Sequence, residues 1–244
     1  MYKEFSYYYD LLTFDIDYDK YASNIFKILQ DHGIESGRML EIACGSGNLT
    51  KRLAQKDFDI LAFDNSLEML NMAYDKLIDY GNVELISQDM FEFPYEDFEF
   101  DVVVSLLDVI NYVIEEDKLE KLFSSIYSSL KKGGAFIFDL NSEYKLKEVL
   151  GNKTYVYEKD NVFYTWENSL QGDLVYFDLN FFVKENGLYS RFREEQVERY
   201  YPIEFIVNLL EKIGFSDITY VDEDGANGYK EKATQRILFK AIKL

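Results

Sequence analysis

The sequence predicts an α/β fold built around an open, mostly parallel β-sheet, and three observations support this prediction. Between Arg38 and Leu140, apolar runs typical of buried strands alternate with helical patterns. Acidic residues close the first two apolar runs, and glycines follow the first directly. From about Tyr155 to Tyr201 the pattern changes to the alternation typical of antiparallel strands. We therefore expect a parallel α/β domain that carries an inserted antiparallel sheet.

The expected elements follow from apolar runs and from helix-capping residues. Five strands are expected at residues 38–43, 58–64, 83–87, 100–107 and 135–140. Helical stripes are expected near residues 21–29, 48–55, 65–78, 119–130 and 203–213. The parallel pattern resumes after the insertion, with two last strands at 217–221 and 235–242 and a polar loop between them.

The inserted segment alternates with a period of two residues. One face of an expected strand would carry Phe177, Leu179, Phe181 and Val183, and the other Tyr176, Asp178, Asn180 and Phe182. Asn186-Gly187 predicts a tight hairpin turn, because both residues adopt positive φ readily. We expect the insertion to form a sheet of its own.

Composition limits the classes of function. Hydrophobic residues make up 48% and aromatic residues 17% of the 244 residues, as in a packed globular protein. The 26 basic and 45 acidic residues leave a formal net charge of −19. This balance argues against nucleic acid as a partner, because that binding depends on phosphate neutralisation. A negative field suits a cationic ligand, although it can also serve only solubility.

Other features favour a soluble, cytoplasmic protein. No apolar run reaches the roughly 18 residues needed to cross a bilayer, so we expect no membrane association. The first residues contain no apolar signal core. The single cysteine, Cys44, can form no internal disulfide, which fits a reducing compartment. We expect no metal, and the oligomeric state stays open.

The segment from Glu41 to Gly47 joins a strand to a helix through two glycines. Glycine lets a ligand lie against the backbone because it has no Cβ. A dinucleotide-binding turn would have a third glycine where this chain has Thr50, and it would hold a pyrophosphate at the helix N-terminus. Glu41 would repel phosphate but could hold a water or a ligand ammonium. The turn therefore favours a positively charged ligand without phosphates.

Acids also end the next two strands. Asp64, 19 positions after Gly45, could accept hydrogen bonds from both hydroxyls of a ribose, or it could cap the next helix. Asp89 could accept from an adenine amino group while Met90 covers the ring, or it could serve only as a turn residue.

Together these residues resemble the class I S-adenosylmethionine-dependent methyltransferases. The acid and alternating glycines of that family's first motif match Glu41, Gly45 and Gly47, while Asp64 and Asp89 match its ribose and adenine acids. The lead-in from Phe5 to Asp10 is similar to that of small-molecule members, whose tyrosine before the aspartate lies near the cofactor. The sequence segments at 108–112, 138–142 and 164–166 resemble those of an uncharacterised bacterial subgroup with a β-sheet insertion. That subgroup is close to amino-sugar and glycine/sarcosine N-methyltransferases.

The resemblance implies a Rossmann-like, doubly wound seven-stranded sheet, mostly parallel, with an inserted antiparallel β-lid and S-adenosylmethionine as cofactor. It implies that residues 1–150 and 202–244 bind the cofactor and that 151–201 form the lid. The implied cofactor contacts are Tyr9, Glu41, Ala43, Gly45, Gly47, Asp64, Asn65, Asp89, Met90 and Leu106. Ala43 replaces the family's first glycine, and we expect cofactor binding to survive if its φ is negative.

Candidates for the methyl acceptor follow the strand at 100–107, because ligands of open parallel sheets lie beyond the carboxyl ends of the strands, where the strand order reverses. Asp108 could hold an ammonium or take its proton, or it could cap a short turn. Tyr9 is a second catalytic candidate. His32, the only histidine, is expected at a helix C-terminus, so no histidine base is expected. The expected acceptor contacts are Asn111, Tyr112, Trp166, Arg193 and Tyr201, although most aromatic residues of the insertion could instead form its own core.

The sequence thus predicts methyl transfer to a small-molecule acceptor, an amine being favoured, by in-line displacement. Such transfer depends mainly on positioning and on exclusion of water. One alternative is a non-catalytic, nucleoside-binding regulatory module. Another is a methyltransferase that acts on a protein or a carboxylate. An NAD-dependent oxidoreductase is disfavoured because Thr50 replaces the third glycine. No catalytic histidine, and no Tyr-x-x-x-Lys pair, can be assigned to the site either.

Overall fold

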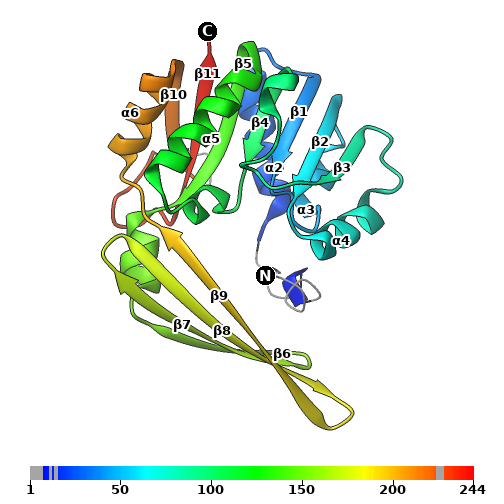
Figure 1. The fold of residues 1–244 in the computed structure, drawn as a ribbon, viewed down its shortest axis with the longest axis vertical. Coiled ribbons are helices and arrows are strands. Elements are labelled where there is room, and N and C mark those ends of the chain that lie inside the picture. Colours follow the sequence, from blue (N-terminus) through cyan, green and yellow to red (C-terminus); the bar gives the residue numbers. More distant parts are fainter. Residues whose placement is uncertain (1–7, 11–12, 14–15, 224–227) are drawn as a thin grey trace.

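The computed structural model describes residues 8–10, 13, 16–223 and 228–244. A seven-stranded sheet crosses the body of the protein, and a separate four-stranded sheet extends from it (Figure 1). Of the expected lead-in motif, Phe5, Ser6 and Tyr7 lie outside the described residues. Part of the expected polar loop after Asp222 also lies outside them.

The main sheet has the strand order β10-β11-β5-β4-β1-β2-β3. Its strands are β1 (Gly37–Ile42), β2 (Phe58–Asp64), β3 (Val83–Ser87), β4 (Phe100–Ser105), β5 (Leu130–Asn141), β10 (Phe215–Asp222) and β11 (Arg236–Lys243). All neighbours pair in parallel except β11, which is antiparallel to both β5 and β10. The strand order reverses between β1 and β4. The expected doubly wound, mostly parallel sheet of seven strands is confirmed.

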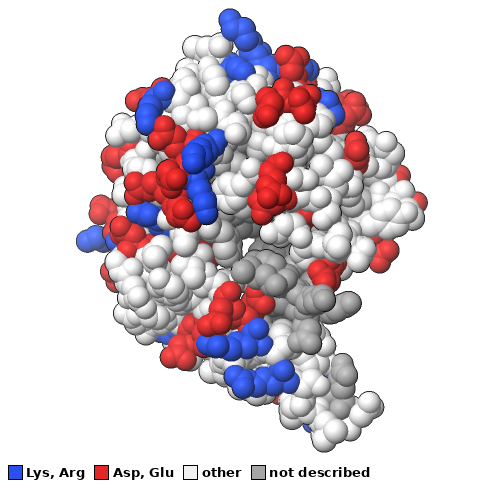
Figure 2. Space-filling model, viewed as in Figure 1, with Lys and Arg blue, Asp and Glu red and all other residues white. Residues whose placement is uncertain are grey.

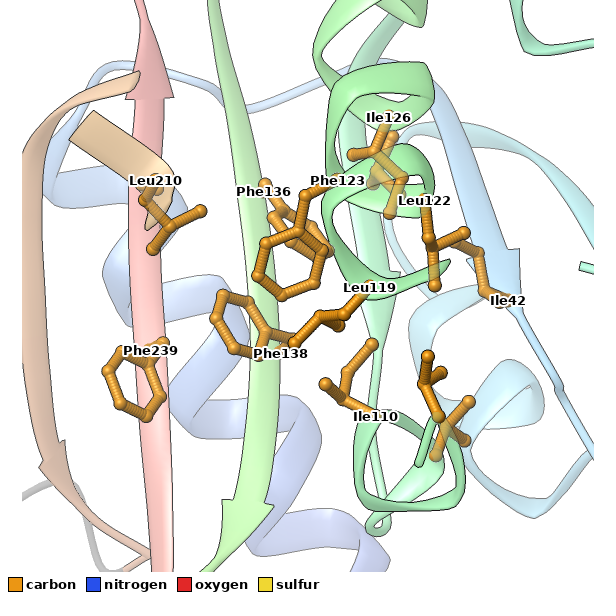
Figure 3. Packing of buried hydrophobic residues seen from close by; sticks show 14 of the residues in the cluster. Ile42, Ile110, Leu119, Leu122, Phe123, Ile126, Phe136, Phe138, Leu210 and Phe239 are labelled. Atoms are coloured by element: carbon orange, nitrogen blue, oxygen red, sulfur yellow. The ribbon is translucent and has the colours of Figure 1, made fainter. Parts of the chain in front are cut away.

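Helices cover both faces of this sheet, because strand side chains alternate between two apolar cores. Met39 of β1 faces one core, and Ile42 faces the other. Figure 3 shows the second core, where Phe123 packs against Phe136 and Phe138 with ring centroids 5.3 and 5.2 Å apart. The first core is covered by α2 (Tyr18–Asp31), α3 (Asn48–Leu53) and α4 (Leu67–Leu77), and the second by α5 (Glu116–Ser129) and α6 (Ile203–Ile213).

Several boundaries differ from the expected ones for local backbone reasons. The strand β4 ends at Ser105 instead of residue 107, because Leu107 (φ 64°) and Asp108 (φ 60°) leave the β region. The strand β5 begins at Leu130, five residues before the expected start, and so includes residues 131–134. Three short helices were not expected: η1 (Tyr95–Asp97), η2 (Val109–Tyr112) and η3 (Tyr144–Leu150).

The inserted segment forms the second sheet, which we call the lid sheet. Its strands are β6 (Thr154–Lys159), β7 (Val162–Gln171), β8 (Leu174–Glu185) and β9 (Leu188–Arg199), and all neighbours are antiparallel. The expected alternation is confirmed on β8, where Phe177, Leu179, Phe181 and Val183 are buried. Asn186 (φ 51°) and Gly187 (φ 82°) form the expected turn between β8 and β9.

Among the described residues, no helix combines the length and the apolar character that a bilayer crossing requires.

Candidate functional site

A cavity of about 670 Å³ lies at the carboxyl ends of the central strands and extends beneath the lid sheet. This volume lies within the range of small-molecule sites. In Figure 2 the surface is hollowed between the body of the protein and the lid sheet, and Lys and Arg are interspersed with Asp and Glu over the face shown. One half of the cavity adjoins β1, β2 and β3, and the other adjoins β4, β5, β11 and the lid sheet.

The turn after β1 contributes backbone to the first half. Ala43 (φ 56°), Gly45 (φ 55°) and Gly47 (φ 75°) all lie in the left-handed region. The condition of a negative φ at Ala43 is therefore not met. This alanine adopts a left-handed conformation that glycine would take without strain, at a cost of roughly 1–2 kcal/mol. Ala43 and Gly45 line the cavity.

Gly47 has a different role from Gly45. It does not line the cavity, and a Cβ built on it would lie 2.9 Å from Ala73 Cβ on α4. The missing side chain at Gly47 lets α3 and α4 pack closely, whereas the space beside Gly45 is open within 4 Å.

Asp64 ends β2 at the wall of the cavity, as expected. Its Oδ2 accepts from Gly45 N at 2.9 Å, and its Oδ1 accepts from Ser66 N at 2.9 Å. The carboxylate therefore ties the turn after β1 to the start of α4, where Ser66 is the N-cap. Burial raises the pKa of Asp64 above its usual range, in opposition to these hydrogen bonds. Asn65 also lines the cavity.

Asp89 and Met90 lie together on the cavity wall after β3. Asp89 Oδ1 accepts from Phe91 N at 2.8 Å, which is the turn contact considered as its alternative role. Leu106 lies across the cavity at the end of β4 and is 5% exposed.

Glu41 lies in the floor of the cavity and is 3% exposed. Burial raises its pKa to about 8, and the nearby Asp64 carboxylate contributes to the rise. Its Oε2 has no hydrogen-bond partner among the described residues. A buried polar atom without a partner is costly, so a ligand cation or amine at this point would be stabilised. The residues present therefore fit a cofactor that brings an ammonium group and a sulfonium charge.

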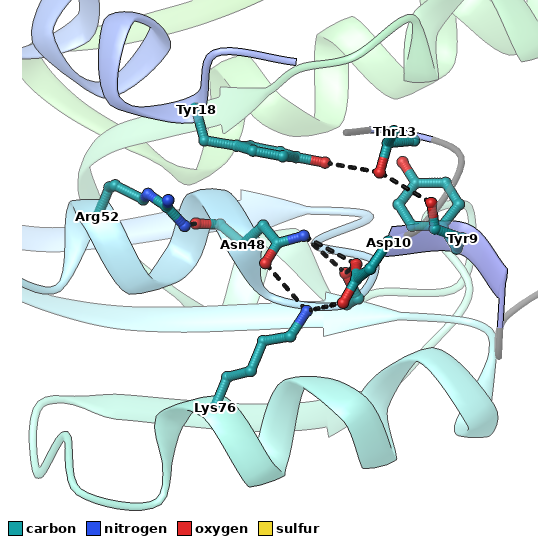
Figure 4. A network of polar contacts seen from close by, with 8 residues as sticks. Tyr9, Asp10, Thr13, Tyr18, Asn48, Arg52 and Lys76 are labelled. Carbon is teal, nitrogen blue, oxygen red and sulfur yellow. Dashed lines mark hydrogen bonds and ion pairs between the residues drawn. The ribbon is translucent and has the colours of Figure 1, made fainter. Parts of the chain in front are cut away.

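Residues 8–10 are joined to the turn after β1 and to α4 by the contacts of Asp10 (Figure 4). Asp10 Oδ1 accepts from Ser46 Oγ at 2.6 Å and from Asn48 Nδ2 at 2.8 Å, while Oδ2 pairs with Lys76 Nζ at 2.6 Å. Burial would raise the pKa of Asp10, but these contacts outweigh it and hold the pKa below its usual range. Tyr9, the residue before, lines the cavity.

A buried ion-pair cluster forms the inner wall of the second half. Arg236 of β11 pairs with Asp108 at 2.6 Å and with Asp139 at 3.3 Å. Asp139 accepts from the backbone N–H groups of Leu107 and Asp108 at 3.0 and 2.8 Å, and so holds the left-handed turn that presents Asp108. Burial would raise the pKa of Asp108, but the charges of Arg236 and Lys145 outweigh it and lower the pKa.

Next to this cluster, Asn141 connects two more charged groups that line the cavity. Its Nδ2 donates to Glu198 Oε2 at 2.7 Å, and its Oδ1 accepts from Lys145 Nζ at 2.9 Å. Burial and the charge of Asp108 raise the pKa of Glu198 to about 8. Burial and the charge of Arg236 lower the pKa of Lys145.

Aromatic side chains of the lid sheet cover the same half of the cavity. The rings of Tyr157 and Tyr164 stack with centroids 4.9 Å apart, and Tyr155 lies 5.9 Å from Trp166. Trp166 Nε1 is buried without a hydrogen-bond partner among the described residues. Tyr112, opposite them, donates to Gln196 Oε1 at 2.8 Å. The structure thus brings Tyr112 and Trp166 to the cavity, as expected.

Three expected acceptor contacts lie elsewhere. Asn111 is fully buried, where its Nδ2 donates to Arg199 O and its Oδ1 accepts from Asn141 N, both at 2.8 Å. Tyr201 is buried, and its hydroxyl donates to Val113 O. Arg193 is half exposed on β9 and pairs with Asp178 and Glu195. None of the three lines the cavity, so each contributes to the fold and not to the cavity wall.

His32 lies far from this site, as expected. It is the C-cap of α2, and its ring nitrogens contact Ile28 O at 2.9 Å and Asp217 at 2.7 Å.

The sequence analysis missed several charged and aromatic residues of the cavity. Gln196 and Glu198 of β9 pair with Phe177 and Val175, so they lie on the sheet face that is otherwise apolar. A polar residue at a strand position that faces an apolar core often has a functional role, so the alternation on β9 could have identified Glu198 as a candidate. Arg236 opens the strand β11. It reaches the carboxyl end of the sheet only because β11 runs antiparallel to β5, and the sequence pattern did not show that direction.

Comparisons with known proteins agree with this geometry. Residues 39–134 match a family described as a methyltransferase domain. Over its full length the chain is 32% identical to the "Putative methyltransferase YqeM" of Bacillus subtilis (strain 168), of which it covers 97%. A crystal structure of an S-adenosylmethionine-dependent methyltransferase from Clostridium acetobutylicum ATCC 824 matches with a TM-score of 0.89 at 37% identity, covering 99% of this chain and 98% of that one.

The sugar N-methyltransferase KedS8 from Streptoalloteichus sp ATCC 53650 shares the fold. Its TM-score is 0.80 at 20% identity, covering 96% of this chain and 92% of that one. An open α/β sheet with a glycine turn, strand-end acids and an inserted β-sheet is the architecture of enzymes that transfer a methyl group from a nucleoside cofactor. The comparisons agree with that class. The chain belongs to the class I S-adenosylmethionine-dependent methyltransferases. When bound, S-adenosylmethionine supplies a methyl group activated by the positive sulfur.

Proposed function

We propose that this enzyme methylates an amine of a small molecule held in the half of the cavity between β4, β5, β11 and the lid sheet. One observation carries the proposal: this half combines an aromatic wall, which includes Trp166, with the carboxyl groups of Asp108 and Glu198. Aromatic faces attract cations, and a buried carboxylate stabilises an ammonium strongly. The name of KedS8, a sugar N-methyltransferase, supports an amine acceptor.

The division of the cavity supports separate roles for the two halves. We propose that residues 1–150 and 202–244 hold the cofactor and that the lid, 151–201, covers the acceptor. The proposed cofactor contacts that line the cavity are Tyr9, Glu41, Ala43, Gly45, Asp64, Asn65, Asp89, Met90 and Leu106. Gly47 supports the same turn from outside the cavity. Tyr112 and Trp166 are the proposed acceptor contacts from the sequence analysis.

The chemistry requires little beyond positioning. An amine nitrogen held in line with the methyl group, in a cavity that excludes water, reacts without further activation of the donor. An ammonium must first lose a proton, so a basic group beside the acceptor is needed.

The proposal is tested by incubating the protein with S-adenosylmethionine and a panel of glycine, sarcosine, glucosamine, cyclohexylamine and benzylamine. Matched alcohols and carboxylic acids serve as controls. We expect formation of S-adenosylhomocysteine with an amine and a product heavier by one methylene group. Turnover only with the acids, or only with a protein substrate, would contradict the amine proposal. Cofactor binding without turnover on any compound would favour a regulatory module.

A further inference from the structure

The carboxyl group of Glu198 differs from every other acid at the acceptor half of the cavity. It is 4% exposed, lines the cavity and lies on the lid sheet, whereas Asp108 and Asp139 belong to the body. Asp108 and Asp139 are both paired with Arg236. Among the described residues, no Lys, Arg or His nitrogen lies within 4.0 Å of the Glu198 carboxylate oxygens, and the amide of Asn141 donates to its Oε2.

Hydrogen bonds from β5 and from η2 hold Glu198 and the neighbouring backbone of β9 in place. Asn141 orients it through Nδ2, and the backbone N–H of Asn141 is held in turn by Asn111 Oδ1. Asn111 also donates to Arg199 O, the residue after Glu198 on β9. This chain of contacts fixes the position of Glu198 relative to the end of β5, where the acceptor half begins.

The protonation of Glu198 depends on the charge of Asp108. Burial and the charge of Asp108 raise the pKa of Glu198, while the charges of Arg236 and Lys145 keep the pKa of Asp108 below its usual range. Two carboxyl groups whose charges interact hold one proton between them over part of the pH range, because ionising both is opposed by repulsion. Arg236 neutralises Asp108, so the shared proton belongs to Glu198.

We propose that Glu198 binds the ammonium group of the acceptor and takes its proton, with Asp108, Asn141 and Lys145 as positioning residues. This inference rests on the proposed amine methylation. It moves the role of base, for which Asp108 was one candidate, to a residue of the lid sheet.

The step balances without any other reagent. An N–H proton of the ammonium passes to a Glu198 carboxylate oxygen, which leaves a lone pair on nitrogen. That lone pair forms the bond to the methyl carbon as the carbon–sulfur bond breaks, and the bonding electrons stay on sulfur as it loses its positive charge. The proton on Glu198 then leaves to solvent when the product departs.

The proton affinity of Glu198 predicts the pH dependence. Its pKa of about 8 means that the free enzyme carries the carboxyl form below pH 8 and the carboxylate above it. The groups that face it are Asp108, Lys145, Arg236 and Asn141. An ammonium acceptor needs the carboxylate, so kcat/KM should rise with pH to near 8 and fall above the pKa of the amine itself.

The test compares Glu198→Gln with Glu195→Gln, both on β9. Glu195 is exposed outside the cavity and pairs with Arg193, so its variant is a matched control. A glutamine at 198 still accepts from Asn141 Nδ2, so folding should be kept, as checked by thermal unfolding and by S-adenosylhomocysteine binding. We expect Glu198→Gln to lose about 100-fold or more in kcat with the amine that the wild type methylates, and to lose the rising limb near pH 8. Glu195→Gln should keep both.

A second measurement does not depend on activity. In protein labelled with ¹³C at glutamate carboxyl groups, one resonance should titrate near pH 8, be absent in Glu198→Gln and persist in Glu195→Gln. Binding of the same amine to the S-adenosylhomocysteine complex at pH 7 should release a proton in the wild type but not in Glu198→Gln. If the wild type methylates an amine while Glu198→Gln keeps its rate and pH profile, the role of Glu198 is wrong and the proposed function stands. If the wild type methylates no amine in the panel, both are wrong.

Discussion

The backbone N–H of Gly45 donates a hydrogen bond to Asp64 Oδ2 over 2.9 Å, and this contact joins the turn after β1 to the end of β2. The glycine turn and the acid at the end of β2, which both suggested a nucleoside site, are therefore in direct contact. Any ligand that lies against the open backbone at Gly45 also meets the carboxylate of Asp64.

Replacing Asp64 should therefore weaken cofactor binding. We expect Asp64→Ala to lower the affinity for S-adenosylhomocysteine about 10- to 100-fold, equivalent to about 1–3 kcal/mol, because a charge-assisted hydrogen bond is lost and the turn is released. Calorimetric titration measures the change. Asp59→Ala, an exposed position on the same strand, should bind normally. An unchanged affinity in Asp64→Ala would remove Asp64 from the cofactor site.

The positive φ of Ala43 predicts a stabilising substitution. Ala43→Gly should raise the free energy of unfolding by about 0.5–1 kcal/mol, because removal of the Cβ relieves left-handed strain by more than glycine loses in entropy. Urea unfolding measures the difference. Ala54→Gly, at φ −65°, should have the opposite sign. A destabilised Ala43→Gly protein would show that the alanine methyl contributes packing that outweighs the strain.

The buried carboxyl of Glu41 predicts a fall in stability between about pH 4.5 and pH 8. Its pKa is raised from 4.5 to about 8 in the native state, so the native protein keeps a proton that the unfolded chain has released over this window. The free energy of unfolding should fall with rising pH, by at most about 1.4 kcal/mol per pH unit for this group. Thermal unfolding of Glu41→Gln without cofactor should show a shallower slope. An identical slope would mean that Glu41 is ionised in the native state.

The contacts of Asp10 predict that the N-terminal segment can be released without unfolding the body. Asp10→Ala removes the acceptor for Ser46, Asn48 and Lys76, so hydrogen exchange around residues 8–13 should become faster. Exchange in β1 to β5 should change little. Asp19→Ala breaks a more exposed ion pair, with Arg52 at 3.0 Å, and serves as the control. Unchanged exchange near residue 10 would show that other contacts hold the segment.

The strands could be predicted well where a continuous apolar run ended at a polar residue. The strand β2 runs from Phe58 to Asp64 and β3 from Val83 to Ser87, as expected from the sequence. Asp64 and Asp89 could then be expected on the same side of the sheet, because the carboxyl ends of parallel strands meet there. Both line the cavity in the structure.

Predictions for single side chains were weaker where competing partners lay far along the chain. Asn111 was a reasonable acceptor contact by position, but its amide nitrogen donates to Arg199 O and its amide oxygen accepts from Asn141 N. Arg193 lies on the face of β9 opposite to Gln196 and Glu198, where it pairs with Asp178 of β8. Neither partner could be assigned from local sequence.

The parallel core, the glycine turn, the strand-end acids and the inserted antiparallel sheet could all be predicted from the sequence alone. These depend on short-range patterns, namely apolar periodicity, turn residues and the shared direction of parallel strands. Only the tertiary structure decided the backbone conformation of Ala43, the pairing of Asp108 with Arg236 and the placement of Glu198 beside Asn141. The physical reason is that the charge state of a buried group depends on neighbours brought together from β4, β5, β9 and β11, and no local pattern records which of them will meet.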